Sequence, residues 1–457
     1  MNLIQPLFAR VARLLKVEAE AKEKRLSETQ RANLLSNFGA IVLNGLFFPT
    51  AGKILGAGLL LTWFLDELKA SAFVIGLVIP IQYGAALLAQ PWIGQWLSTK
   101  PRRARYYRVQ AIARAVLWCG LGVAAWLAAD TTPAFLIALF FIVVVGDAVA
   151  AGLGNIAFSD TLARTIPKQL RGRARGWRGV CGAAVAGTAG VLITLFVSGE
   201  SGIRMFALLF AVAGICYGIG GLTFGTIREP PQDPPSTING ASAASLTSRM
   251  RRILRDKVFR RFYAVEALLI PATQGLVFFS IFGRREFHLD MKALGLLLVS
   301  DAAAPFIGNY VWGKLSDRRG NRLVIGAAAI IALAAPAMAI LLHFSAQDFT
   351  HGTVLAFFAA IVFAVGFASV GVDIATKNFV LDLAADPERP VYIGTNDTLV
   401  ALPTMLLVAG GFAIDRAGYL PVFIAIACCT GAAVALMGRL PRESRENRPP
   451  VAGATLQ

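Results

Sequence analysis

The chain has 457 residues, of which 56% are hydrophobic and only 16% are charged, a balance that excludes an ordinary water-soluble enzyme. A helix that crosses a membrane needs about 20 mainly apolar residues. The apolar residues come in blocks that supply about twelve helices of this length. The composition therefore predicts an all-α polytopic membrane protein.

The charge is strongly positive, with 44 Lys and Arg against 27 Asp and Glu and a net charge of +17. In a soluble domain such an excess would favour nucleic-acid binding. The apolar blocks are treated as spans that alternate sides, and a cation within three residues of a span's end is counted with the adjoining loop. On this count 35 of the cations fall in one set of loops and tails, 6 in the opposite set and 3 within spans. Cytoplasmic loops carry such an excess. The distribution predicts that both termini are cytoplasmic and that nucleic acid is not a partner.

The predicted spans form two sets of six. Those of the first half, residues 33–225, lie at 34–65, 72–97, 106–129, 134–163, 179–198 and 204–225. Those of the second half, residues 261–438, lie at 261–283, 293–315, 323–344, 353–383, 393–414 and 420–438. A cytoplasmic N-terminal segment (1–32), a linker rich in Pro and Ser (226–260) and a cytoplasmic tail (439–457) complete the predicted organisation.

Two segments beside the spans, 3–16 and 248–262, have apolar residues at helical spacing among arginines and lysines. Each pattern suits a helix that lies on the membrane surface. Each is equally consistent with a basic extension of the neighbouring span, and the sequence leaves both interpretations open.

The two halves repeat weakly. An offset of 219 residues places GQWLSTKPRR (94–103) against GKLSDRRGNR (313–322), and an offset of 222 places Asp160 opposite Asp382. Internal duplication of this kind is typical of secondary transporters.

The segment GKLSDRRGNR resembles the inside-loop signature of the major facilitator superfamily. Its two glycines, its acid and its arginines correspond to Gly313, Asp317, Arg318, Gly320 and Arg322. The resemblance extends over about residues 33–438. It implies twelve transmembrane helices in two pseudo-symmetric six-helix bundles, which rock about a central cavity and expose it to each side in turn.

The chemistry of the loop agrees with a gate. An aspartate at a helix end can be held by arginine and by free backbone N–H groups, and such a latch can break and form again. The alternative is that these arginines only set the topology. The first copy keeps Gly94 and Arg103 but lacks the acid. The residues expected to act in gating are Gly94, Arg103, Asp160, Gly313, Asp317, Arg318, Gly320, Arg322, Asp382 and Asp397.

Charged residues within spans are functional candidates, because each costs several kcal/mol unless it is paired or hydrated. Arg114 is expected to pair with Asp147 rather than to contact substrate. Asp373 and Lys377 are four residues apart, so they share a helix face and can pair. Lys53 is the most central cation. It either contacts an anionic group of the substrate or balances one of the acids Asp147, Asp301 and Asp373.

If protons drive transport, a carboxylate must carry them, because all three histidines lie in or near the outside loops. Asp301 is the first choice, since its own helix holds no cation. Asp373 is second and Glu266 third. The competing interpretation is that Asp301 is a structural acid with satisfied partners.

A set of polar and aromatic residues within the spans is predicted to contact the substrate, although such residues more often serve packing. The set is Asn44, Lys53, Gln82, Tyr83, Asp147, Asn155, Gln274 and Phe278.

No nucleotide-binding loop, catalytic motif or metal-ligand spacing is recognisable in the sequence, so neither an enzyme nor a cofactor is expected. The sequence predicts a secondary active transporter of a small organic solute, coupled to protons, monomeric and located in a bacterial inner membrane. The alternative function is a non-transporting sensor or assembly factor with the same fold.

Overall fold

The computed structural model describes residues 5–15, 28–84, 93, 96–97, 100–129, 133–196, 202–229, 243–345, 347, 349–383 and 389–440. Within these ranges the regular structure is helical, without strands. Eleven helical segments of the described chain are long and apolar enough to cross a membrane, and a shorter apolar helix covers Ala72–Gly84. That helix lies within the predicted span 72–97. The predicted all-α membrane fold is confirmed, with a helix count close to the predicted twelve.

The first bundle begins with α1 (Gln5–Leu14), which packs on α3 (Glu28–Ile54). The remaining helices of this bundle are α4 (Leu60–Glu67), α5 (Ala72–Gly76), α7 (Ala104–Leu127), α8 (Pro133–Thr165), α9 (Lys168–Phe196) and α10 (Ile203–Phe224). Phe8 and Ala12 of α1 are buried, so this amphipathic helix uses its apolar side against the bundle.

The second bundle begins with α11 (Ala243–Arg255) and α12 (Lys257–Gln274). It continues with α13 (Leu276–Glu286), α14 (Met291–Arg319), α15 (Asn321–Ser345), α16 (His351–Leu383), α17 (Arg389–Met405), α18 (Val408–Ala417) and α19 (Tyr419–Met437). The Asp256 side chain accepts a hydrogen bond from the Val258 N–H at 2.8 Å and caps α12. Because of this break, α11 is a separate helix and not an extension of the seventh span.

The first span of each half is broken in a corresponding place. The first span consists of α3 and α4, and the seventh consists of α12 and α13, with Gly275 at the junction. Pro49 in α3 and Pro271 in α12 precede the breaks, and 271 − 49 = 222, one of the two repeat offsets in the sequence. Proline removes a helical hydrogen bond and clashes with the preceding turn. The duplicated prolines therefore account for duplicated bends.

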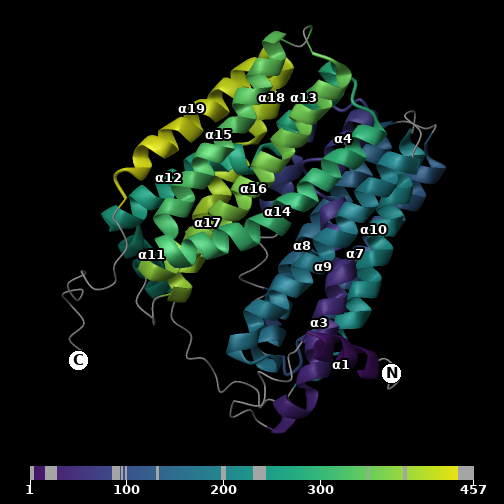
Figure 1. Ribbon diagram of the computed structural model, residues 1–457, viewed down its shortest axis with the longest axis vertical. Coiled ribbons are helices and arrows are strands. Elements are labelled where there is room, and N and C mark those ends of the chain that lie inside the picture. Colours follow the sequence, from purple (N-terminus) through teal and green to yellow (C-terminus); the bar gives the residue numbers. More distant parts are fainter. Residues whose placement is uncertain are drawn as a thin grey trace.

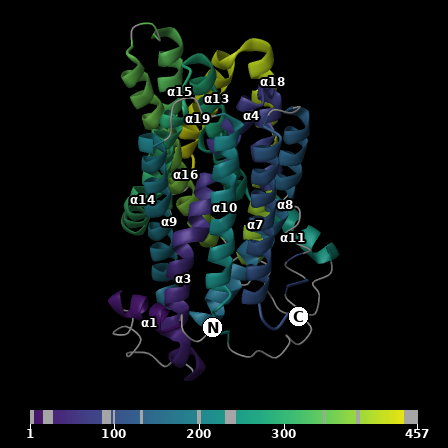
Figure 2. The same ribbon diagram turned by 90° about the vertical axis from the view of Figure 1, so that its right-hand side faces the viewer.

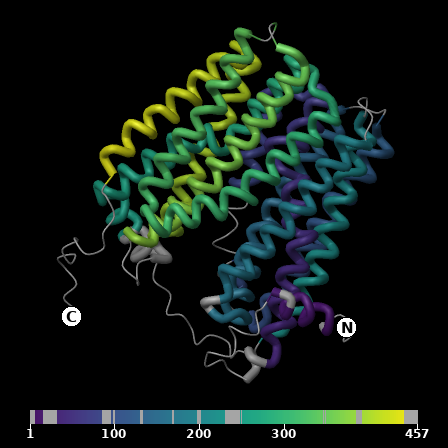
Figure 3. Tube along the Cα trace, in the orientation of Figure 1, coloured from purple at the N-terminus to yellow at the C-terminus, as the bar shows by residue number. Residues whose placement is uncertain are grey.

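The two bundles lie close together at one end and diverge toward the other (Figure 1). We call the first the closed end; α4, α5, α13 and α18 lie there. We call the second the open end; α1 and α11 lie there (Figures 1 and 2). The diverging paths of the helices are clearest in the tube (Figure 3). The bundles contact each other mainly through α9 with α14 and through α5 with α18.

Candidate functional site

One ion pair joins the two bundles about halfway along the spans. Lys53 Nζ in the last turn of α3 lies 2.9 Å from Asp301 Oδ2 in α14, and it also donates to the Asp301 backbone oxygen at 3.3 Å. The two side chains are 34% and 17% exposed. Of the three partners that the sequence left open for Lys53, the structure places Asp301 against it.

Arg114 and Asp147 form a second pair, which lies wholly within the first bundle. Arg114 Nε and Nη2 donate to the two carboxylate oxygens at 2.7 and 2.9 Å, and Trp118 Nε1 donates to Oδ1 at 2.6 Å. The guanidinium also donates to the Tyr217 hydroxyl at 2.5 Å. Asp147 is only 2% exposed. In this conformation the protein's own donors occupy both oxygens of Asp147.

Asn44 and Phe278 were also predicted to contact substrate, and in the structure both are buried in contacts with the protein itself. Asn44 is fully buried; it donates to the Gly220 backbone oxygen at 2.8 Å and accepts from Arg178 Nε at 2.8 Å. Phe278 is 2% exposed and lies at the closed end against Gly410. The rotation of a helix about its axis determines whether a given side chain faces the cavity or the interior of its bundle. Residue type alone does not predict this rotation.

Glu266 is the buried acid of the second bundle. Its side chain lies in α12 within hydrogen-bonding range of Thr376 and Asn396, and the acids Asp373 and Asp397 are near enough to act on its charge. Its Oε2 atom has no hydrogen-bond partner among the described residues, and the same is true of Asn396 Oδ1. No ion pair involving Glu266 occurs in the described part of the chain. This carboxyl therefore keeps one oxygen available for a proton.

Asp373, by contrast, pairs with Lys377 one turn further along α16, with 2.6 Å between Oδ1 and Nζ. Both side chains are more than half exposed, at 62% and 68%. An exposed pair of this kind is worth little to stability, so it can open at low cost.

The remaining candidates for substrate contact are polar groups on several spans. Tyr83 is half exposed, and the charges of Asp301 and Asp373 act on it. Gln82 is partly buried and Asn155 is exposed. Gln274 Oε1 accepts a hydrogen bond from Thr404 Oγ1 at 3.3 Å. The structure leaves all four as candidates.

The closed end holds an ion-pair cluster that sequence reasoning missed. Arg284 Nε and Arg285 Nε of α13 donate to the two oxygens of Asp66 at 3.0 and 2.6 Å, and Arg284 also pairs with Glu67. The internal repeat could have indicated this cluster. Its offset of 219 residues aligns Asp66 with Arg285, since 285 − 66 = 219. Residues related by a two-fold axis meet where the two halves touch on that axis. We call these four residues the closed-end latch.

A carboxylate reinforces the closed end. Asp415 in α18 accepts from the backbone N–H groups of Ala72 and Phe73, both at 2.9 Å, at the start of α5 in the other bundle. A negative charge at a helix N-terminus satisfies free N–H groups and complements the helix dipole. Gly411, one turn earlier, allows close approach, since a Cβ there would lie 2.3 Å from the Ala72 backbone oxygen.

At the open end the predicted gating residues form contacts within the first bundle. Asp160 pairs with Arg103 and, at 2.5 Å, with Arg164. Glu229 accepts from the backbone N–H groups of Arg103 and Ala104 at 2.7 and 2.9 Å. Burial lowers the pKa of the Arg103 guanidinium, and the charges of Asp160 and Glu229 oppose this shift. Glu229 thus supplies an acid beside the first loop, whose motif lacks one.

In the second bundle Asp382 Oδ2 accepts from Asn321 Nδ2 at 3.1 Å, and Arg322 donates to the Gly438 backbone oxygen at 3.2 Å. Gly320 ends α14 with φ at +82°, a conformation that glycine adopts without steric cost. The other gating candidates take simpler positions. Gly313 is partly buried, and Gly94 lies outside the described residues. Asp317, Arg318 and Asp397 are exposed and form no ion pair with the residues that the structure describes.

These features define a helical membrane transporter: two bundles of spans, contacts between them at one end, and charged groups at the middle of the spans. The family model of the Major Facilitator Superfamily matches residues 41–284 and 277–456. The chain belongs to the major facilitator superfamily. It is a transporter and not an enzyme.

Two relatives are uncharacterized proteins of Mycobacterium tuberculosis and Mycobacterium bovis. Each is 25% identical over 428 residues, which cover 87% of this chain and 76% of the relative. Among solved structures, a variant of the nucleoside transporter NupG has a TM-score of 0.66 at 14% identity and covers 88% of this chain and 99% of that chain. A bacterial homologue of the iron transporter ferroportin, in an inward-facing state, has a TM-score of 0.60 at 13% identity and covers 89% of this chain and 99% of that chain. These structural likenesses show the fold alone.

Proposed function

We propose that the protein is a secondary active transporter that moves a small organic solute by alternating access and couples this movement to protons. The observation that carries the proposal is the Lys53–Asp301 ion pair, which joins the two bundles at mid-depth while they diverge toward the open end. A solute that passes between the bundles must displace or use these charges.

The open end is assigned to the cytoplasm. The cation-rich loops and both ends of the described chain lie there, and the positive-inside rule places such loops in the cytoplasm. The conformation is then inward-facing. We place the protein in a bacterial inner membrane with both termini inside.

The substrate region proposed here comprises Lys53 and Asp301 with the polar groups around them, namely Gln82, Tyr83, Asn155 and Gln274. Opposite charges side by side suit a solute that carries a charged group of its own, because such a group can replace one partner of the pair. Asn44, Asp147 and Phe278 are left out, because their contacts are internal.

Glu266 is the acid that the geometry supports best as proton carrier. Asp301, the first choice from sequence, lies against Lys53, which balances its negative charge. Glu266 is 7% exposed and keeps an oxygen without a hydrogen-bond partner among the described residues. A charged carboxylate in such a place costs several kcal/mol, and binding a proton removes that cost. Asp301 and Asp373 remain the other candidates.

The test starts with a thermal-shift screen of purified protein against metabolites, sugars, peptides and drugs. A solute at a hundred times its dissociation constant adds roughly 2.7 kcal/mol to the bound state. Each solute that shifts the unfolding temperature is then assayed for uptake into proteoliposomes, with and without a pH gradient. Uptake that the gradient stimulates supports the proposal. The absence of gradient-dependent flux for any bound solute would favour a non-transporting role.

The coupling residue is tested with the same assay. We expect Glu266→Gln to abolish the stimulation by a pH gradient while exchange of solute at equal pH continues. Asp301→Asn should weaken solute binding in both conditions. Glu286→Gln, which changes an exposed acid at the outer end of the same span, is the matched control and should behave as wild type. Gradient-stimulated uptake that survives in Glu266→Gln would exclude Glu266 as the proton carrier.

A further inference from the structure

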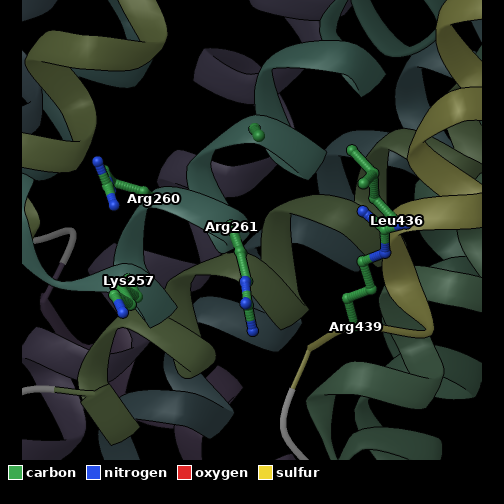
Figure 4. Close-up of a pocket in the computed structure, with 6 residues that line it drawn as sticks. Lys257, Arg260, Arg261, Leu436 and Arg439 are labelled. Carbon is green, nitrogen blue, oxygen red and sulfur yellow. The ribbon is translucent and has the colours of Figure 1, made fainter.

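A basic cavity lies at the open end between α12 and α19, away from the residues that the transport proposal uses. It has a volume of about 440 Å³, and its lining residues are Lys257, Arg260, Arg261, Ala264, Leu436 and Arg439. Four of these six are cations and none is an acid. Figure 4 shows Lys257, Arg260 and Arg261 on one helix and Leu436 and Arg439 on the other.

The chain builds this cavity through helical spacing. Lys257, Arg260, Arg261 and Ala264 follow the pattern i, i+3, i+4 and i+7, which places them on one face of α12. Leu436 and Arg439 are three residues apart at the end of α19, so they also share a face. The contact between α12 and α19 brings the two faces together.

The cations of the cavity are exposed, and no acid neutralises them. Lys257, Arg260, Arg261 and Arg439 are all exposed, and none takes part in an ion pair found among the described residues. Four like charges at one place repel one another. The cavity is therefore suited to bind an anion.

The position of the cavity along the membrane identifies the kind of anion. The membrane-crossing segments run from Lys257 to Glu286 and from Tyr419 to Met437, so the cations lie at the very ends of two spans. Ala264 is one turn deeper than the arginines of α12, and Leu436 is one turn deeper than Arg439. Both helices thus present charge at the membrane surface and apolar side chains toward its interior, the layout of a phospholipid.

A second groove on the other side of α19 repeats this layout. Its volume is about 770 Å³, and its walls include Arg319 and Arg322 at one end and Leu323, Gly326 and Ile330 further along α15. Ile330 is 60% exposed, as expected for a side chain that faces acyl chains. The end of α19 is therefore flanked on both sides by cations followed by apolar surface.

We propose that the cavity between α12 and α19 binds the headgroup of an anionic phospholipid in the leaflet at the open end, with its acyl chains along the outer faces of these helices. Basic pockets between spans bind anionic headgroups, and each cation near the surface contributes roughly fivefold to the affinity. The proposal is independent of substrate and proton coupling, because it uses none of the residues assigned to them.

The test uses full-length protein in detergent, titrated with phosphatidylglycerol or phosphatidylcholine of the same acyl chains, with bound lipid counted by native mass spectrometry. We expect phosphatidylglycerol to bind at least tenfold more tightly. The double variant Arg260→Gln with Arg261→Gln should lose most of this preference, roughly tenfold or more. Equal binding of the two lipids by the wild type would overturn the proposal.

The matched control is Arg102→Gln with Arg105→Gln, which removes two exposed arginines around the first turn of α7 in the other bundle. This variant should keep the preference; an equal loss in both variants would mean attraction to net charge alone and would overturn a defined site. If the α12 variant does not fold, Arg439→Gln tests the same cavity from α19, with an expected loss of about fivefold. Inorganic phosphate that displaces phosphatidylglycerol at equal concentration would instead indicate a site for free anions and would also overturn the proposal.

Discussion

The charged residues within the spans differ most in how far they are buried, and burial decides their roles. Arg114 and Asp147 are 8% and 2% exposed and make a two-pronged ion pair, whereas Asp373 and Lys377 are mostly exposed. Removing one partner of a buried pair leaves an uncompensated charge in an apolar medium. An exposed charge that loses its partner is stabilised by solvent instead. The first pair is therefore structural, and the second is free to change partners.

We expect Asp147→Asn to lower the free energy of unfolding by roughly 3–5 kcal/mol, because the Arg114 guanidinium would remain buried without its counter-charge. Asp373→Asn, which also replaces a carboxylate by an amide, should cost less than about 1 kcal/mol. The measurement is reversible unfolding in mixed detergent, followed by tryptophan fluorescence. Equal losses of stability in the two variants would contradict the assignment of separate roles.

At the scale of elements, small residues permit the close contact of α9 with α14 that joins the two bundles. Gly190 of α9 and Gly295 of α14 face each other; a Cβ on Gly190 would lie 2.7 Å from the Gly295 backbone oxygen. Gly187, one turn earlier in α9, has space for a side chain, since an added Cβ would lie 3.8 Å from the nearest atom of Ala302. Within the glycine-rich fifth span, Gly190 therefore permits the close approach of α14, whereas Gly187 is not required for it.

Gly190→Ala should push α9 and α14 apart and open the closed end, at a cost of roughly 1–3 kcal/mol to this conformation. Gly187→Ala is the matched control in the same helix and should be neutral or slightly stabilising, because alanine favours helix by about 1 kcal/mol over glycine. A cysteine placed at Ser280, which is buried at the closed end, reports the change through its rate of alkylation. A rate that rises as much in the control would argue against the glycine contact as the cause.

For the whole molecule, the contacts divide into a set between bundles and a set within them. The closed-end latch, the Asp415 cap and the Lys53–Asp301 pair join the bundles, whereas the predicted gating charges Arg103 and Asp160 interact inside one bundle. A change of access requires the first set to break while the second persists. Ion pairs and helix caps suit this task, since they form and break without disturbing the core of either bundle.

Alternating access predicts opposite changes at the two ends. Spin labels at Ala134 and His351 report on the closed end, and labels at Ser159 and Lys314 report on the open end, in a background from which the five free cysteines have been removed. When the pH or a bound solute shifts the equilibrium, the first distance should lengthen as the second shortens. Asp66→Asn with Glu67→Gln should favour the longer distance at the closed end. Distances that change in the same direction, or not at all, would contradict a rocking motion.

The sequence alone was enough to predict the helices, their number, the duplicated halves, the family and the side on which cations gather. These properties depend on hydropathy, charge and motif spacing, which are local or repeated along the chain. It also paired Arg114 with Asp147 and Asp373 with Lys377. The first pair brings together the two charges nearest the middle of adjacent spans, and the second pair is separated by a single helical turn.

Only the tertiary structure decided which charges meet across the molecule. Lys53 and Asp301 are 248 residues apart, and the rotation of each helix about its axis determines whether they face each other. The same rotation buries Asn44, Asp147 and Phe278, exposes Asp373, and leaves an oxygen of Glu266 without a hydrogen-bond partner among the described residues. Helix rotation depends on many packing contacts between bundles, which involve residues far apart in the sequence. It therefore cannot be predicted from any single segment of the sequence.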